Sequence, residues 1–184
     1  MIHGAFQTAA TWDLVPPRLK GAGRRVIVAA LTGLENDASE LTENVTLDTH
    51  IRDIIALLQR DDLSGVILVG HSYAGMIITG VAERARDRIA HLVYVDAFVP
   101  EHGRSALDIL PESTRNAFRK LAEEGGGLRM QPNDHLLDLW GLEEDSARAF
   151  IQKRLADFTI RCFSQPVEAR SHAAHKLPVR TSRA

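Results

Sequence analysis

The chain has 184 residues, of which 45% are hydrophobic and 25% are charged, and these proportions are ordinary for one globular domain. Its 22 basic and 24 acidic side chains leave a formal net charge of −2, which argues against a nucleic-acid partner. The single cysteine, Cys162, excludes an internal disulfide and a cysteine-cluster metal site. No apolar run reaches the roughly 18 residues that span a bilayer, and residues 1–7 do not form a signal peptide, so we expect a cytoplasmic protein with no membrane partner.

Strand-like and helix-like segments alternate through the first half of the chain. A short helix is predicted over residues 12–19, where prolines suit the first turn. Apolar runs rich in β-branched residues are typical of strands buried on both faces, and they occupy residues 26–31, 66–69 and 89–95. Apolar positions with a 3.6-residue period predict helices between these strands, over residues 47–58 and 73–86. This order predicts an α/β fold with a parallel sheet.

The pattern changes after Pro100. Helices are predicted over residues 111–124 and 142–158, with no strand-like run between them. We interpret residues 101–158 as a helical cap inserted into a single domain that spans residues 1–184. The remaining segment is basic and weakly patterned.

The segment Gly70-His71-Ser72-Tyr73-Ala74 lies between a predicted strand and a predicted helix. On so sharp a turn a serine is pushed out at the carboxyl end of the sheet, and residues two positions before and after it must be small. Gly70 and Ala74 meet this requirement. The helix that follows directs its free N–H groups toward an anion formed beside Ser72. A serine that merely caps a helix is the alternative, but this position favours a catalytic nucleophile.

The sequence resembles the α/β-hydrolases, and within them the branch of small esterases, plant methylesterases and hydroxynitrile lyases. The resemblance covers residues 2–110 closely and residues 140–178 loosely. The motifs that carry it are residues 3–5, 12–13, 31–34, 47–50, 69–73 and 95–100. It implies a mostly parallel sheet of the α/β-hydrolase type with a small helical cap. It also implies hydrolysis of a small carboxylic ester without a metal or an organic cofactor.

The resemblance implies roles for three residues. Ser72 is the nucleophile, and the backbone N–H groups of Ala5 and Tyr73 form the oxyanion hole. A plain tight turn is the alternative for the His3-Gly4 segment. The lyases of this branch carry threonine where this chain has Gly4, and they use a lysine near their C-terminus, so an esterase is favoured over a lyase. The side chains of Tyr73, Trp140 and Phe98 are interpreted as walls of a pocket or of the core.

In the resembled family the acid and the histidine of the catalytic triad follow the nucleophile, in loops after the last two strands. This chain reaches Ala184 where the acid-bearing strand is expected to begin, and only Met1 and Ile2 precede His3. We therefore expect a chain truncated at both ends, an incomplete sheet and weak esterase activity. Two other functions stay open: a catalytically inactive hydrolase-like fragment or binding protein, and a hydroxynitrile lyase.

Several side chains after Ser72 are candidates for the missing base and acid. The histidines are His91, His102, His135, His172 and His175. His91 begins a strand and is interpreted as structural, whereas His102 follows the carboxyl end of that strand. Asp96 also lies at this end, but an aspartate that anchors a loop is the favoured interpretation.

An incomplete sheet has a further consequence for the strand at residues 89–95. Without a strand after Val179, this apolar strand is expected to form a bare edge, which favours aggregation or pairing with a second copy. We therefore expect marginal stability and a homodimer formed through this edge.

Overall fold

The computed structural model describes residues 1–20, 23, 25–35, 41–170 and 177–182. The elements before Pro100 are η1 (Ala9–Trp12), α1 (Pro16–Lys20), α2 (Leu47–Arg60), β1 (Val66–His71), α3 (Ala74–Arg84), η3 (Arg86–Arg88) and β2 (Ile89–Val95). Those after it are α4 (Ala106–Ile109), α5 (Glu112–Glu124), β3 (Arg129–Met130), α6 (Asp134–Leu139), α7 (Asp145–Gln152), β4 (Phe158–Thr159), α8 (Ile160–Ser164) and β5 (Val179–Ser182). Within the described residues, the helices are all too short or too polar to cross a membrane.

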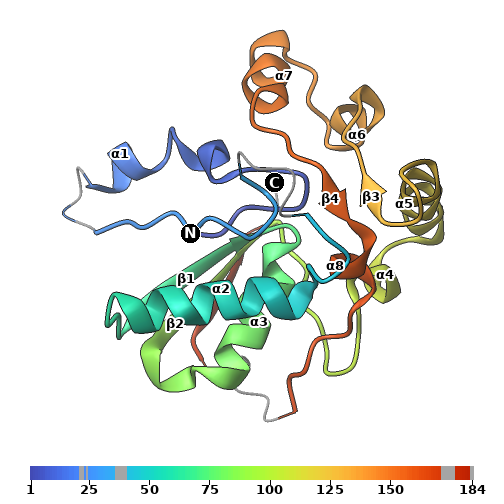
Figure 1. Cartoon of the computed structure of the whole chain (residues 1–184). Helices are drawn as coiled ribbons and strands as arrows, with labels where there is room; N and C mark the ends of the chain where they lie inside the picture. The colour runs from blue at the N-terminus through green and yellow to red at the C-terminus, as the bar shows by residue number, and fades with distance from the viewer. Residues whose placement is uncertain (21–22, 24, 36–40, 171–176, 183–184) are drawn as a thin grey trace.

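A parallel sheet with the strand order β1-β2-β5 forms the centre of the fold. Helix α3 packs on β1 and β2, and α2 packs on α3, so both helices cover one face of the sheet (Figure 1). The Thr79 hydroxyl of α3 and the Tyr94 hydroxyl of β2 are hydrogen-bonded at 2.8 Å. The predicted helices over residues 47–58 and 73–86 are therefore confirmed as α2 and α3, and the helix predicted over residues 12–19 is divided between η1 and α1.

The segment at residues 26–31 is extended but forms no regular ladder. It lies beside Met1, whose carbonyl accepts a 3.0 Å hydrogen bond from the Ala29 N–H. Ile2 in turn forms a parallel bridge with Gly70 of β1, with hydrogen bonds of 2.8 Å to the Val69 carbonyl and 3.1 Å from the His71 N–H. The prediction of a strand over residues 26–31 is therefore wrong: these residues form no β-ladder, although hydrogen bonds join Ile27 and Ala29 to Met1.

The expected bare edge on β2 is wrong. Strand β5 pairs with β2 in parallel, from Leu92 opposite Val179 to Val95 opposite Ser182. The polar side chains of Arg180 and Thr181 are exposed to solvent. They do not prevent pairing, because the backbone forms the hydrogen bonds to β2 and an edge strand tolerates polar side chains. Because β5 covers this edge, the structure gives no support for a homodimer that pairs through β2.

The region after Pro100 is confirmed in one helix and corrected in another. Helix α5 matches the prediction over residues 111–124, but the helix predicted over 142–158 is only Asp145–Gln152. The expected absence of strands is also wrong, because β3 and β4 form a short antiparallel pair. Helix α7 ends at Gln152, and Phe158 of β4 is buried with its ring against those of Tyr73 and Phe163, whose centroids are 5.1 and 4.9 Å away. Whether residues 101–158 act as a cap remains a prediction.

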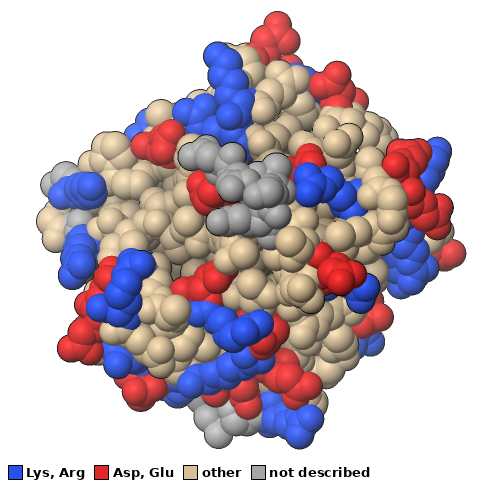
Figure 2. Space-filling model, viewed as in Figure 1, with Lys and Arg blue, Asp and Glu red and all other residues tan. Residues whose placement is uncertain are grey.

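Figure 2 shows how charged side chains are distributed over one face of the molecule. On the face shown in Figure 2, basic and acidic residues are interspersed, and the described residues there form no extended patch of one sign.

Candidate active site

Ser72 lies at the turn between β1, which ends at His71, and α3, which begins at Ala74. Its φ angle is +52°, a left-handed conformation that is uncommon and costly for a residue with a side chain. Three backbone hydrogen bonds hold it there. The Ser72 N–H donates to the Val95 carbonyl at 3.3 Å, and the Ser72 carbonyl accepts from Gly75 and Phe98, each at 3.1 Å. The structure therefore maintains a strained backbone at the residue predicted to be the nucleophile.

The need for small residues around Ser72 is visible in the packing. A Cβ atom at Gly70 would lie 2.8 Å from the Ala74 carbonyl oxygen, so the two positions singled out in the sequence approach each other directly. A Cβ atom at Gly75 would lie 1.9 Å from the Phe98 carbonyl oxygen. Real Cβ contacts are longer than this, so the segment that contains Phe98 passes over α3 only because residue 75 is glycine.

The loop that follows Ile2 lies directly beside Ser72, because Ile2 and β1 are parallel neighbours whose carboxyl ends meet at one edge of the sheet. A Cβ atom at Gly4 would be 3.0 Å from the Ser72 Cβ. The Gly4 N–H donates to Oε1 of Gln7 at 3.2 Å, and Gln7 is buried. Gln7 thus fixes the loop, a role that no local pattern in the sequence indicated.

The N–H groups of Ala5 and Tyr73 remain available. Within the described residues, no acceptor takes either of them, and both flank Ser72 in sequence or in space. Two unpaired backbone donors beside one hydroxyl group suit the binding of an oxyanion.

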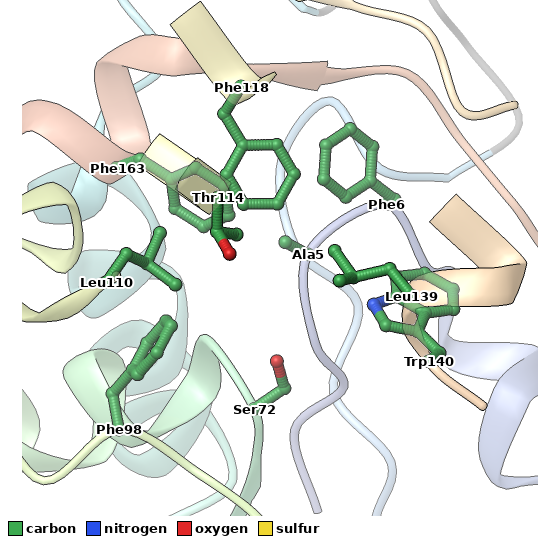
Figure 3. Close-up of a pocket in the computed structure, with 10 residues that line it drawn as sticks. All are labelled: Ala5, Phe6, Ser72, Phe98, Leu110, Thr114, Phe118, Leu139, Trp140 and Phe163. Atoms are coloured by element: carbon green, nitrogen blue, oxygen red, sulfur yellow. The ribbon is translucent and has the colours of Figure 1, made fainter. Parts of the chain in front are cut away.

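Ser72 and Ala5 open into a cavity of about 230 Å³. Most of its wall is aromatic or aliphatic, and the Ser72 hydroxyl points into the space (Figure 3). The lining residues are Ala5, Phe6, Ser72, Phe98, Leu110, Thr114, Phe118, Leu139, Trp140 and Phe163. Phe98 and Trp140 are walls of this cavity, as predicted, whereas the contribution of helix α5 was not recognised in the sequence.

The Tyr73 side chain lies in the core, away from the cavity. It is fully buried, and its hydroxyl is 3.1 Å from Nδ1 of His50. Because Nε2 of His50 donates to the Thr32 carbonyl at 3.1 Å, Nδ1 is the acceptor for the Tyr73 hydroxyl. Burial lowers the pKa of His50 and raises that of Tyr73, so both side chains stay neutral. Tyr73 is therefore anchored in the core by its side chain, next to Ser72 in the chain.

Cys162 lies next to this network and is not a competing nucleophile. Its Sγ is 3.8 Å from His50 Nδ1, and burial raises the pKa of the thiol to about 12. The thiolate, which is the reactive form, is therefore not populated near neutral pH.

The candidate bases lie away from the cavity or outside the described residues. His102 is exposed, and its Nδ1 accepts the Ala169 N–H at 3.2 Å. His91 on β2 and His135 on α6 are also exposed. His172 and His175 lie outside the described residues. Among the histidines that the structure describes, none lines the cavity with Ser72.

Asp96 follows β2 with a φ angle of +42° and an exposed side chain. This geometry places it at the carboxyl edge of the sheet, near the Ser72 turn, but outside the lining of the cavity. The part of the chain that the structure describes contains no cluster of three His, Cys, Asp or Glu side chains able to hold a metal ion.

The chain is similar in sequence to a family of hydrolases and to several esterases. A family model described as "Alpha/beta hydrolase family" matches residues 1–182. The carbendazim hydrolyzing esterase of Nocardioides sp. is 47% identical over 113 residues, which are 61% of this chain and 47% of that protein. Methylesterase 2 of Arabidopsis thaliana is 31% identical over 160 residues, 84% of this chain and 58% of that protein. The chain spans about half the length of these curated relatives.

The fold is shared with solved structures. An extracellular alpha/beta-hydrolase from a Paenibacillus species superimposes with a TM-score of 0.87 at 24% sequence identity. The match covers 99% of this chain and 75% of that one. This likeness, at under 25% sequence identity, concerns the fold.

Proposed function

This chain belongs to the alpha/beta hydrolase family and has its fold, and from this premise we propose that it hydrolyses small carboxylic esters with Ser72 as the nucleophile. One observation carries the proposal. Ser72 has a left-handed backbone at a strand-to-helix turn, and its hydroxyl points into an apolar cavity beside the Gly4-Ala5 loop. The esterase relatives support the same reaction class.

In the proposed reaction, Ser72 Oγ attacks the carbonyl carbon of the ester. The electron pair of the C=O bond moves to the oxygen, which accepts hydrogen bonds from the N–H groups of Ala5 and Tyr73. The tetrahedral intermediate then expels the alcohol and leaves an acyl group on Ser72, and water hydrolyses this ester in a second step. In this mechanism a histidine accepts the Ser72 proton and returns it to the alcohol.

The residues after Pro100 act in this proposal as a cap over the acyl or alcohol group. Leu110 precedes α5, Phe118 lies on α5, and Leu139 and Trp140 lie at the end of α6; together they form one side of the cavity. The remaining wall comes from the sheet side. An ester bound there is shielded from water on both sides, which strengthens the hydrogen bonds to the oxyanion.

A binding protein without hydrolytic activity is the second candidate. It is favoured by one observation, that no described histidine lines the cavity with Ser72. A hydroxynitrile lyase is disfavoured, because the lyases of this branch carry threonine where this chain has Gly4. A side chain at Gly4 would begin 3.0 Å from the Ser72 Cβ and would require the loop to shift.

Hydrolysis of p-nitrophenyl acetate separates these functions. We expect the 184-residue chain to hydrolyse it weakly, but faster than the roughly 10³–10⁴-fold over water that serine hydrolases keep when only the oxyanion hole and substrate contacts remain. Ser72→Ala should lower the rate to that residual level, because the acylation of Ser72 is lost. Ser64→Ala, a matched change at an exposed serine before β1, should leave the wild-type rate unchanged. A wild-type rate equal to that of Ser72→Ala would favour the binding protein.

A further inference from the structure

The cavity beside Ser72 contains a second polar side chain. Thr114, in the first turn of α5, contributes its hydroxyl to the wall, and this hydroxyl points into the same space as that of Ser72 (Figure 3). The proposed reaction, which uses Ser72 and the N–H groups of Ala5 and Tyr73, gives this hydroxyl no role.

The Thr114 hydroxyl has no partner within the described residues. A threonine in a helix can donate its hydroxyl to a carbonyl three or four residues earlier, but no such bond is formed by Thr114. The side chain is half-buried. A ligand that fills the cavity would therefore remove water from this hydroxyl, and only a polar atom on the ligand could replace the lost hydrogen bond.

The rest of the wall restricts the charge of the ligand. Among the described residues, no lysine, arginine, aspartate or glutamate lines the cavity, and the side chains nearest to Thr114 in Figure 3 are those of Leu110, Phe118 and Phe163. A carboxylate or an ammonium group would lose its hydration without gaining an ion pair, which is costly. The ligand is therefore neutral.

The volume restricts its size. A protein cavity of roughly 150 Å³ holds one benzene molecule. The cavity beside Ser72 has about 230 Å³, enough for one ring with a short ester group. It is smaller than the roughly 300–1,000 Å³ of sites for drug-sized ligands.

We propose that Thr114 determines specificity in this cavity by hydrogen-bonding a polar atom on the ring of the ligand, so that the site selects neutral one-ring esters with a hydroxyl group or ring heteroatom. The orientation of the ester toward Ser72 rests on the proposed esterase function. Recognition by Thr114 does not, because it is a property of binding.

Binding to the Ser72→Ala chain tests this proposal without turnover. Three esters are titrated by calorimetry: methyl benzoate, methyl 3-hydroxybenzoate and methyl 4-hydroxybenzoate. We expect at least one hydroxylated ester to bind about three- to tenfold more tightly than methyl benzoate, which is the effect of one neutral hydrogen bond. Adding Thr114→Val, which replaces the hydroxyl with a methyl group, should remove this preference and leave the affinity for methyl benzoate unchanged.

Ser113→Ala is the matched control, since Ser113 is exposed on the same turn of α5 and does not line the cavity. It should retain the preference. The proposal is overturned if neither hydroxylated ester is preferred, if none of the three esters binds, or if the preference survives Thr114→Val. Selective binding without ester hydrolysis would contradict the proposed function alone, and hydrolysis without selective binding would contradict the role of Thr114 alone.

Discussion

Lowering the pH from 7.5 to 5.0 is expected to destabilise the fold through His3. This side chain is fully buried behind the loop that faces Ser72. Burial lowers its pKa to about 4, against the opposing effect of the hydrogen bond to the Gly4 carbonyl. Nδ1 donates to the Gly4 carbonyl at 3.0 Å, while Nε2 has no hydrogen-bond partner among the described residues; the Glu35 carboxylate is 3.8 Å away.

The sign and the size follow from proton linkage. In the unfolded chain His3 titrates near 6.5, so between pH 6.5 and 4 the unfolded state binds more protons than the folded state. The stabilisation is complete above pH 6.5 and is lost as the pH falls toward 4. His3 alone accounts for a loss of about 2 kcal/mol between pH 7.5 and 5.0, a large part of the 5–15 kcal/mol typical of a domain. Burial also lowers the pKa values of His50 and His71, which add to the loss.

Urea unfolding at the two pH values measures this loss. We compare the wild type with His3→Gln and with His91→Gln, a control at an exposed position on β2. The loss should be about 2 kcal/mol smaller in His3→Gln and unchanged in His91→Gln. Equal losses in the wild type and His3→Gln, to within about 0.5 kcal/mol, would refute the reasoning that His3 is held neutral.

Three substitutions test other contacts by urea unfolding at pH 7.5. Gly75→Ala places a Cβ 1.9 Å from the Phe98 carbonyl oxygen, so we expect a loss of about 1–3 kcal/mol; an unchanged midpoint would show that this segment moves aside freely. Tyr73→Phe leaves Nδ1 of His50 without its donor and should cost about 1–3 kcal/mol, whereas no loss would mean that the bond is absent. Arg154→Met removes hydrogen bonds to the Ala10 carbonyl and the Asp13 carboxylate, and it should lower the free energy of unfolding by about 1–2 kcal/mol. An equal loss in the exposed control Lys153→Met would mean that these hydrogen bonds to η1 and Asp13 do not stabilise the fold.

The elements around Ser72 were predictable because their determinants are local. Apolar periodicity marked α2 and α3, and the small residues at Gly70 and Ala74 marked the turn between β1 and α3. The packing shows why those positions are small, since a Cβ at Gly70 would touch the Ala74 carbonyl.

The errors arose where distant contacts decide the structure. Strands β3 and β4 have two residues each, too few for a visible period, and Phe158 of β4 packs against aromatic rings from other elements. Polar residues after Val179 argued against a strand, but β5 pairs through its backbone. Thr114 carried no signal either, because it acquires its role only when α5 and the Gly4-Ala5 loop meet around the cavity.

Covalent labelling with a fluorophosphonate, followed by mass spectrometry of the peptides, tests the proposed nucleophile most directly. The reagent transfers its phosphonyl group to a nucleophilic serine and releases fluoride, and its phosphoryl oxygen can accept hydrogen bonds from the N–H groups of Ala5 and Tyr73. Because no described histidine lines the cavity, we expect slow labelling and follow it over an extended time course. We predict a single adduct on the peptide that contains Ser72, and no adduct in Ser72→Ala. An adduct on another residue, or none on the wild-type chain, would contradict the assignment of Ser72.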